Sequence, residues 1–263
     1  MKKFLISMLT VVMSVVLLAS VFGCDNKPAK SSATAYDLVH GNGYLGVVDI
    51  TINKDGKVLD IKIDEVFLPA NWAKQGTEGE NASFTDTWTD ETAGTYAKYI
   101  RIEDKVFEAT EVTARGKHSM PVYAEVNGGD ITDLEAQLVE DAELRTWYYE
   151  AAINDSFKIV KKVGEDFEDE KEGKNNPNGS LFKSQSNYWP SSEGVMGWKG
   201  NIAKMVDYLK ANGVKFDLDD IDKDSETGTF FISDVDTGAT LTDFTDYMTV
   251  VKAAYDKAMK VFA

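Results

Sequence analysis

The segment formed by residues 234–240, Asp-Val-Asp-Thr-Gly-Ala-Thr, brings two carboxylates and two hydroxyls together around a Gly-Ala pair. It follows a strand-like run at 229–232 and precedes a long helix pattern with apolar residues on one face. Thr242 is a good N-cap for that helix, and the amides that open a helix attract anions. Capping requires neither the Gly-Ala pair nor a second threonine at Thr240, so we expect this segment to carry chemistry.

Another acidic segment, residues 217–228, has the composition of a calcium-binding loop. Counting from Asp220 places acids at positions three and five, but position six is Ser225 instead of glycine and position twelve is Phe231 instead of glutamate. The register therefore fails, and we interpret this stretch as a solvated acidic loop.

Two further patterns are weaker indications of a site. Residues 41–46 match the GxGxxG dinucleotide fingerprint, but a β-pattern follows them where that fingerprint needs a helix. The aromatic side chains of Tyr188, Trp189 and Trp198 have faces suited to stacking on a flat ring, although buried aromatic residues more often form core. The sequence holds no GxSxG, HExxH or Walker motif, so we expect no catalytic residue.

The segment 234–240 resembles the D-x-x-(S/T)-G-A-(S/T) signature of FMN-binding domains that are modified by a flavin transferase. In that family FMN is attached through its phosphate to the hydroxyl of the last Ser or Thr, so the resemblance implies a phosphoester on Thr240. The other cofactor-binding residues that it implies are Asp234, Thr237, Gly238 and Ala239. The small residues would leave the backbone open to a bulky nucleotide donor. One departure is Asp243, where the family often has Ser or Thr.

The elements that position this segment begin with a hairpin. Residues 43–66 alternate around Asp55-Gly56, a strong hairpin signal, and look like the Gly-x-x-Gly-x-V-x-V hairpin that begins such domains. We predict an α+β fold in which an antiparallel sheet is covered by the C-terminal helix. The stretch 67–232 is longer than one compact domain needs, which leaves an insertion or a degenerate second copy as alternatives. Residues 90–95 hold the motif's letters in the wrong order, so we expect one flavin.

Between hairpin and motif, the pattern predicts strands at 99–113 and 122–126, one helix over 132–157, and a short helix over 201–212 closed by Gly213. Between these two predicted helices, the acidic and Asn-rich stretch at 164–180 suggests a domain boundary. The predicted parts are a lipoprotein signal peptide at 1–23, a flexible tether at 24–40, a β-rich N-terminal part with a helix at 41–163, a solvated connector at 164–180, and a C-terminal part with the motif at 181–263.

The N-terminus has the pattern of an export signal. Lys2 and Lys3 precede an apolar run at 4–22, and Gly23 and the single cysteine, Cys24, follow the run. A cysteine directly after the cut resembles a bacterial lipobox, which implies a diacylglycerol on Cys24. The alternative is an uncleaved transmembrane anchor, since the run is just long enough to span a bilayer. Either anchor places the protein at the cell membrane, on its extracytoplasmic face.

The composition excludes several classes of function. The 263 residues include 28 basic and 44 acidic side chains, a net charge of −16, and such a surface repels a phosphate backbone. We therefore expect no nucleic-acid partner. A single cysteine and two distant histidines leave little material for a metal centre, so we expect none.

The resemblance implies a lipid-anchored flavoprotein like those of Gram-positive extracellular electron transfer. Its covalent FMN, added at Thr240 by a flavin transferase, would carry electrons from a membrane donor such as a quinone-linked dehydrogenase. We expect a redox carrier and not a turnover enzyme. Two alternatives stay open: a cofactor-free ligand-binding or adhesive lipoprotein, and a flavin-dependent reductase.

Overall fold

The computed structural model describes residues 28–74, 84–115 and 118–263. The predicted signal peptide and the predicted lipidation site, Cys24, lie outside these residues. Among the helices that are described, none combines the length and the apolar character needed to cross a membrane.

The first sheet has three antiparallel strands in the order β1 (Lys30–Val39), β2 (Tyr44–Asn53) and β3 (Val58–Phe67). The predicted hairpin is β2–β3, and Gly56 takes a φ of +80° in its turn. The predicted tether is wrong from residue 30 onward, because β1 pairs with β2 along its whole length. Its small and polar composition conceals an alternation in which Ala33 and Ala35 pack on one side of the sheet and Tyr36 on the other.

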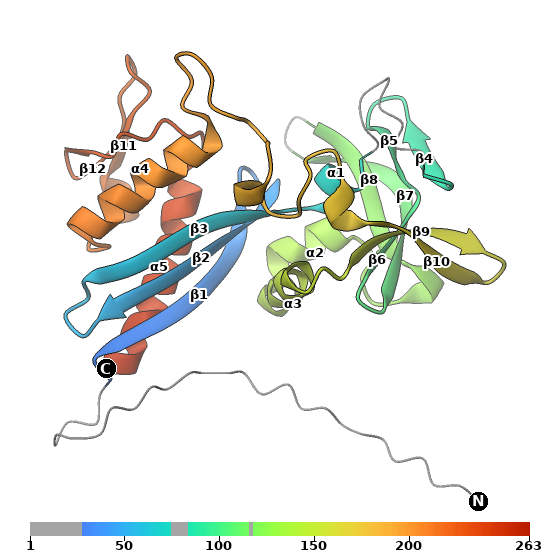
Figure 1. Ribbon diagram of the computed structural model, residues 1–263, viewed down its shortest axis with the longest axis horizontal. Coiled ribbons are helices and arrows are strands. Elements are labelled where there is room, and N and C mark those ends of the chain that lie inside the picture. The colour runs from blue at the N-terminus through green and yellow to red at the C-terminus, as the bar shows by residue number, and fades with distance from the viewer. Residues whose placement is uncertain (1–27, 75–83, 116–117) are drawn as a thin grey trace, which may run out of the picture.

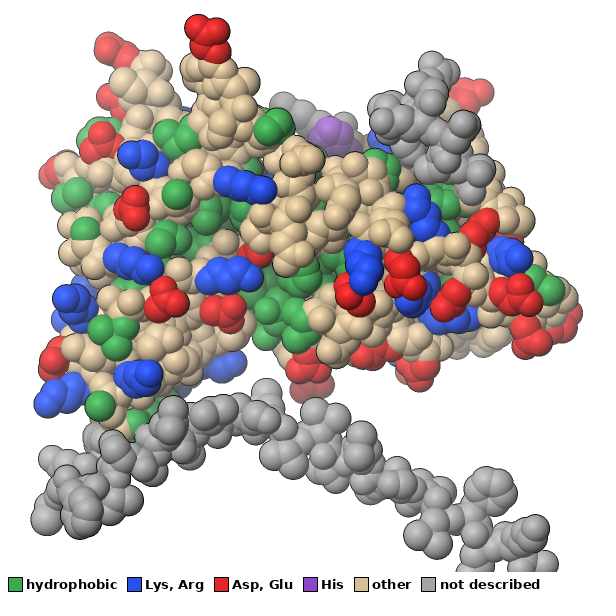
Figure 2. All heavy atoms as spheres, in the orientation of Figure 1, with side chains coloured by type: hydrophobic (Ala, Val, Ile, Leu, Met, Phe, Trp, Pro, Cys, Tyr) green, Lys and Arg blue, Asp and Glu red, His purple; other side chains and the backbone are tan. Residues whose placement is uncertain are grey.

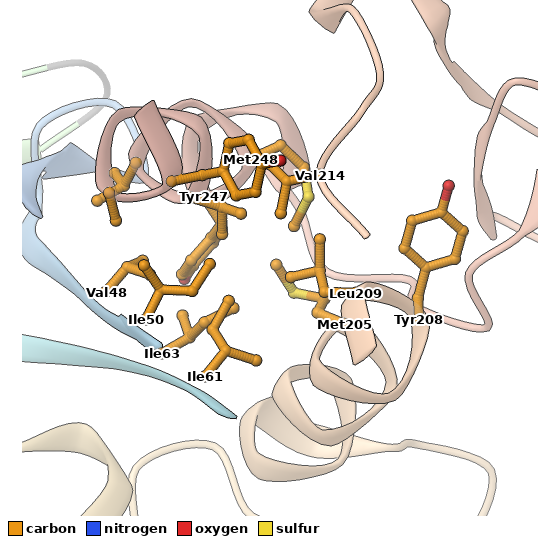
Figure 3. Close-up of a cluster of buried hydrophobic side chains, with 14 of the residues drawn as sticks. Val48, Ile50, Ile61, Ile63, Met205, Tyr208, Leu209, Val214, Tyr247 and Met248 are labelled. Atoms are coloured by element: carbon orange, nitrogen blue, oxygen red, sulfur yellow. The ribbon is translucent and has the colours of Figure 1, made fainter. Parts of the chain in front are cut away.

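The two faces of this sheet contribute to two different cores. Along β2, Val48 and Ile50 face one core, whereas Leu45 and Val47 face the other, as the period of two in a strand requires. Two helices, α4 (Gly197–Asn212) and α5 (Phe244–Met259), cover the first face (Figure 1). Labelled side chains that meet between sheet and helices are Val48, Ile50, Ile61, Ile63, Met205, Leu209, Tyr247 and Met248 (Figure 3).

The second lobe is built from the chain between β3 and α4 (Figure 1). Its main sheet has the order β10-β9-β6-β7-β8, all antiparallel. The strands of this lobe are β4 (Thr87–Asp90), β5 (Gly94–Ala97), β6 (Tyr99–Ile102), β7 (Lys105–Arg115), β8 (His118–Glu125), β9 (Phe157–Val163) and β10 (Asp166–Glu172). Its helices are α1 (Pro69–Trp72), α2 (Leu134–Glu140) and α3 (Ala142–Ile153).

The grouping of the elements differs from the predicted parts. The hairpin predicted within 41–163 shares its first core with α4 and α5 of the C-terminal part. The chain thus leaves the first lobe after β3, builds the second lobe, and returns at α4. This arrangement corresponds to the insertion alternative.

Two predicted elements are wrong for local reasons. The helix expected over 132–157 breaks at Asp141, whose carboxylate caps α3 by accepting the amides of Glu143 at 2.8 Å and Leu144 at 3.0 Å. The acidic run predicted as a connector within 164–180 is largely strand β10. It pairs with lysine-bearing β9, where Lys161 lies 3.4 Å from Glu168, so opposite charges face each other across the pair.

The remaining elements are short. A small sheet of β11 (Ile221–Lys223), β12 (Phe230–Ile232) and β13 (Val235–Asp236) precedes α5. The 3₁₀ turns are η1 (Val126–Gly128), η2 (Gly173–Asn175), η3 (Lys183–Gln185), η4 (Leu218–Asp220) and η5 (Lys260–Phe262). The protein is therefore a mixed α+β molecule with antiparallel sheets, as the pattern predicts.

Candidate functional site

The turn that carries the motif is fixed from inside by Thr237. This side chain is buried, and its hydroxyl donates to the carbonyl of Phe230 in β12 at 2.6 Å. The same oxygen accepts the amide of Ala239 at 3.2 Å, and Ala239 is itself buried. These two predicted residues therefore hold the turn against the small sheet and do not face solvent.

Gly238 occupies a position where a side chain would be strained. Its φ is +69°, and a Cβ there would lie 3.1 Å from Cδ of Lys204 on α4. The Gly238 amide donates to Asp236 at 2.7 Å. Asp234 is exposed, with a φ of +66°, and its carboxylate bonds to no other described residue. The structure thus shows no contact between Asp234 and Thr240.

Thr240 is exposed and is held by one residue of α4. Its amide donates to Oδ1 of Asn201 at 2.6 Å, and its hydroxyl points to the same oxygen at 3.3 Å. Asn201 is fully buried, and its Nδ2 donates to the carbonyl of Gly197 at 2.8 Å. A buried amide with all these partners is a rigid support. Sequence reasoning missed Asn201, although an asparagine among the apolar positions of a helix was the available signal.

Helix α5 begins one residue later than predicted. Its N-cap is Asp243, with a left-handed φ of +60° and no side-chain bond to the helix amides, and not Thr242. The carboxylate of Asp243 instead lies 3.3 Å from Nδ1 of His40, in the turn between β1 and β2. The contact with His40 draws the acid away from the capping position.

A buried charged group lies beside the start of both helices. Glu65, at the end of β3, is 0% exposed and forms a 2.7 Å ion pair with Lys183, which is 2% exposed. Its other oxygen accepts the indole N–H of Trp198 at 2.5 Å and the hydroxyl of Tyr247, and lies 3.6 Å from Nε2 of His40. We call Glu65, Lys183, Trp198, Tyr247 and His40 the Glu65 cluster.

Burial and charge act in opposite directions within the Glu65 cluster. Burial raises the pKa of Glu65, but the neighbouring imidazole of His40 and the charge of Lys183 outweigh it and hold that pKa below its usual value. Burial lowers the pKa of Lys183, and Glu65 offsets part of this effect. Burial raises the pKa of the Tyr247 hydroxyl, as it does for any group whose ionised form is an anion. The low pKa of Glu65 keeps it ionised, so the cluster holds a charge pair shielded from solvent.

Aromatic rings surround the ammonium of Lys183. It lies 4.0 Å from the ring centre of Tyr44 and 4.7 Å from that of Tyr188. Trp198 is buried and bonded to Glu65, so it belongs to the core and cannot stack on a ligand. Tyr188 and Trp189, by contrast, are 37% and 40% exposed. Apart from two acids at the end of an apolar strand, no sequence pattern indicates the Glu65 cluster.

Three acids of the loop 217–228 bond to the loop's own backbone. Asp217 and Asp220 form a capping box, and Asp224 accepts the amides of Glu226 and Thr227. These amide bonds hold the pKa of Asp224 below its usual value. Across the described parts of the chain, no group of three or more His, Cys, Asp or Glu side chains is placed to hold a metal ion.

The surroundings of Thr240 fit a phosphate-linked nucleotide. The hydroxyl is exposed, and Gly238 places no side chain beside it. The stem of Lys204 packs against Gly238, and its ammonium pairs with no carboxylate among the residues described, so it is available to a phosphate. Comparison of the chain with protein-family models, with curated proteins and with solved structures gives no match.

Proposed function

We propose that the protein is a membrane-anchored, extracytoplasmic flavoprotein that carries FMN as a phosphoester on Thr240 and acts as an electron carrier in extracellular electron transfer. The observation that supports this most is the setting of Thr240. Its hydroxyl is exposed at the end of a turn whose neighbouring residues, Thr237 and Ala239, are buried. A flavin transferase can therefore reach this hydroxyl without unfolding the turn.

The chain's own residues prepare Thr240 for esterification. Asn201 binds the amide and orients the hydroxyl, so the lone pairs of the threonine oxygen stay available. Lys204 supplies a positive charge beside the position that the phosphate would take. FMN when bound accepts and releases electrons, while the protein supplies attachment, orientation and electrostatics.

Covalent attachment and a lipid anchor suit a carrier that works outside the cytoplasm, where a dissociated flavin would diffuse away. A lipid on Cys24 would keep the protein near a quinone-linked dehydrogenase as electron donor. The acidic excess gives a surface on which Asp and Glu side chains lie at the edges of both lobes (Figure 2). Docking to a basic partner should consequently weaken as ionic strength rises.

The decisive experiment is co-expression with a flavin transferase, followed by intact-mass measurement and fluorescence in a denaturing gel. The wild-type chain should gain one FMN, Thr240→Ser should keep it, and Thr240→Ala should lose it. Thr242→Ala is the matched control, because Thr242 is also exposed and two residues away, and it should keep the flavin. A wild-type chain that stays unmodified would refute the proposal and favour the cofactor-free lipoprotein.

A further inference from the structure

One aromatic residue next to α4, Trp189, is 40% exposed. The indole of Trp189 makes no hydrogen bond and no ring contact with any described residue. Its backbone has a φ of +46°, in the left-handed region that a residue with a bulky side chain rarely occupies. A strained backbone that presents a bulky apolar side chain to solvent costs stability, and such outliers gather at ligand sites.

The segment that carries Trp189, residues 186–197, is nevertheless held in place. The amide of Trp198 donates to the carbonyl of Trp189 at 3.1 Å. Gly197 has a φ of +69°, and a Cβ there would lie 2.6 Å from the amide of Ser191, so only glycine fits. Ser191 also bonds to the carbonyl of Met196. The backbone that carries the indole is therefore held in place before any ligand arrives.

The same turn of α4 supports both this segment and Thr240. Gly197 packs against the backbone of residues 189–191, and its carbonyl accepts Nδ2 of Asn201, whose Oδ1 accepts the Thr240 amide. Figure 1 shows the segment before α4 rising beside the start of that helix. Trp189 and Thr240 are thus both supported by the start of α4. In FMN the ribityl chain lies between the phosphate and the ring, so the phosphate can be attached to Thr240 while the ring lies near Trp189.

Of the two aromatic residues exposed in this segment, Trp189 is the one whose ring makes no hydrogen bond, cation contact or ring contact with the described chain. The Tyr188 hydroxyl accepts a hydrogen bond from that of Tyr44 at 2.8 Å, and its ring contacts the ammonium of Lys183 and the ring of Phe67. No comparable contact covers the indole of Trp189 within the described chain. Tyr188 therefore anchors the segment, and Trp189 remains available for stacking.

We propose that the indole of Trp189 is the stacking platform for the isoalloxazine ring of the FMN attached to Thr240. This inference rests on the proposed function. An indole and a flavin stack through their faces, which aromatic geometry favours, and a stacked indole quenches flavin fluorescence. Trp189 acts here as a binding residue and takes part in no bond-making step.

The test uses the full chain after modification by the transferase, with Trp189→Ala, Trp189→Phe and Val195→Ala. Val195 is the matched control, because it is 42% exposed in the same segment. Flavin fluorescence of the native protein is divided by the flavin content from mass spectrometry, and visible circular dichroism is recorded on the same samples. Fluorescence per flavin should rise several-fold in Trp189→Ala, rise less in Trp189→Phe, and stay unchanged in Val195→Ala.

The two proposals fail in different ways. If flavin is attached but fluorescence and visible dichroism are the same in wild type and Trp189→Ala, the stacking platform is wrong and the flavoprotein stands. An equal rise in Trp189→Ala and Val195→Ala would also overturn it, since disturbance of the segment would then explain both. A wild-type chain without flavin overturns both proposals.

Discussion

Replacing Lys183 by methionine tests the Glu65 cluster quantitatively. The substitution keeps an unbranched side chain of similar length but removes the ammonium, and with it the 2.7 Å ion pair to Glu65 and the contact with the Tyr44 ring. The carboxylate of Glu65 stays fully buried, with the neutral donors Trp198 and Tyr247 and with His40 at 3.6 Å. The variant therefore leaves a buried anion without its closest cation.

Breaking a buried pair by removing one partner costs about 3–5 kcal/mol, so Lys183→Met should lose this much free energy of unfolding at neutral pH. For a chain of this size, a loss of 1 kcal/mol lowers Tm by about 2–4 °C, which gives a decrease of roughly 6–20 °C. Because the pKa of Glu65 is lowered in the wild type, the pair stabilises the fold at neutral pH and loses this effect as pH falls through that pKa. The difference between wild type and variant should thus shrink in acid.

The assay is urea denaturation and thermal melting of wild type, Lys183→Met and the double variant Lys183→Met/Glu65→Gln. The double variant removes the buried charge and should recover much of the loss, because a glutamine still accepts the bond from Trp198. Lys174→Met is the control, since Lys174 and Asp155 form an ion pair of the same 2.7 Å length but both are exposed; it should leave Tm nearly unchanged. The reasoning is refuted if Lys183→Met melts like Lys174→Met, or if the double variant is no more stable than Lys183→Met.

Two further predictions concern buried polar residues. Asn201→Leu removes the buried acceptor for the Thr240 amide and the side-chain donor to the Gly197 carbonyl. It should lower the free energy of unfolding by about 1–3 kcal/mol in urea denaturation and lower flavin incorporation by the transferase; full incorporation would contradict the positioning role. Burial raises the pKa of Glu135 to about 7, so the folded protein binds more protons than the unfolded one between pH 4.5 and 7 and loses stability as pH rises. At pH 8, Glu135→Gln should therefore unfold at a higher urea concentration than wild type, with a free energy of unfolding that is larger by at most about 3 kcal/mol. Near pH 4 the two proteins should unfold alike. A difference that does not change with pH would show that burial does not govern the pKa of Glu135.

The parts of the fold that sequence patterns predict are those with a local cause. The hairpin around Gly56 and the end of α4 at Gly213 both need a positive φ, and glycine at a turn or a helix end signals it directly. Strand β1 was missed because its stability comes from pairing with β2 and not from its own apolar content. Strand β10 was missed because its acidic composition is typical of a solvated loop, whereas in the fold its acids face the lysines of the preceding strand β9.

The candidate site also contains residues that a local sequence pattern locates and residues that only the packing reveals. The motif locates Thr240 and the turn formed by Thr237 and Gly238, since these residues interact with near neighbours in sequence. Asn201 lies 39 positions before Thr240, and its role follows only from the packing of α4 against the turn. The acidic Asp234 belongs to the motif, yet the structure gives it no partner among the described residues.

The Glu65 cluster lies where the chain leaves the first lobe and where it returns. Glu65 ends β3, and Lys183 follows the second lobe 118 residues later, so their ion pair closes the loop that the second lobe forms. Closing such a long loop costs entropy, which the buried pair and its aromatic neighbours offset. The closure also fixes Trp198, which bonds to Glu65 and stands in the first turn of α4 beside Gly197 and Asn201. Glu65 thus contacts both the segment that returns from the second lobe, through Lys183, and the first turn of the helix whose Asn201 holds Thr240, through Trp198.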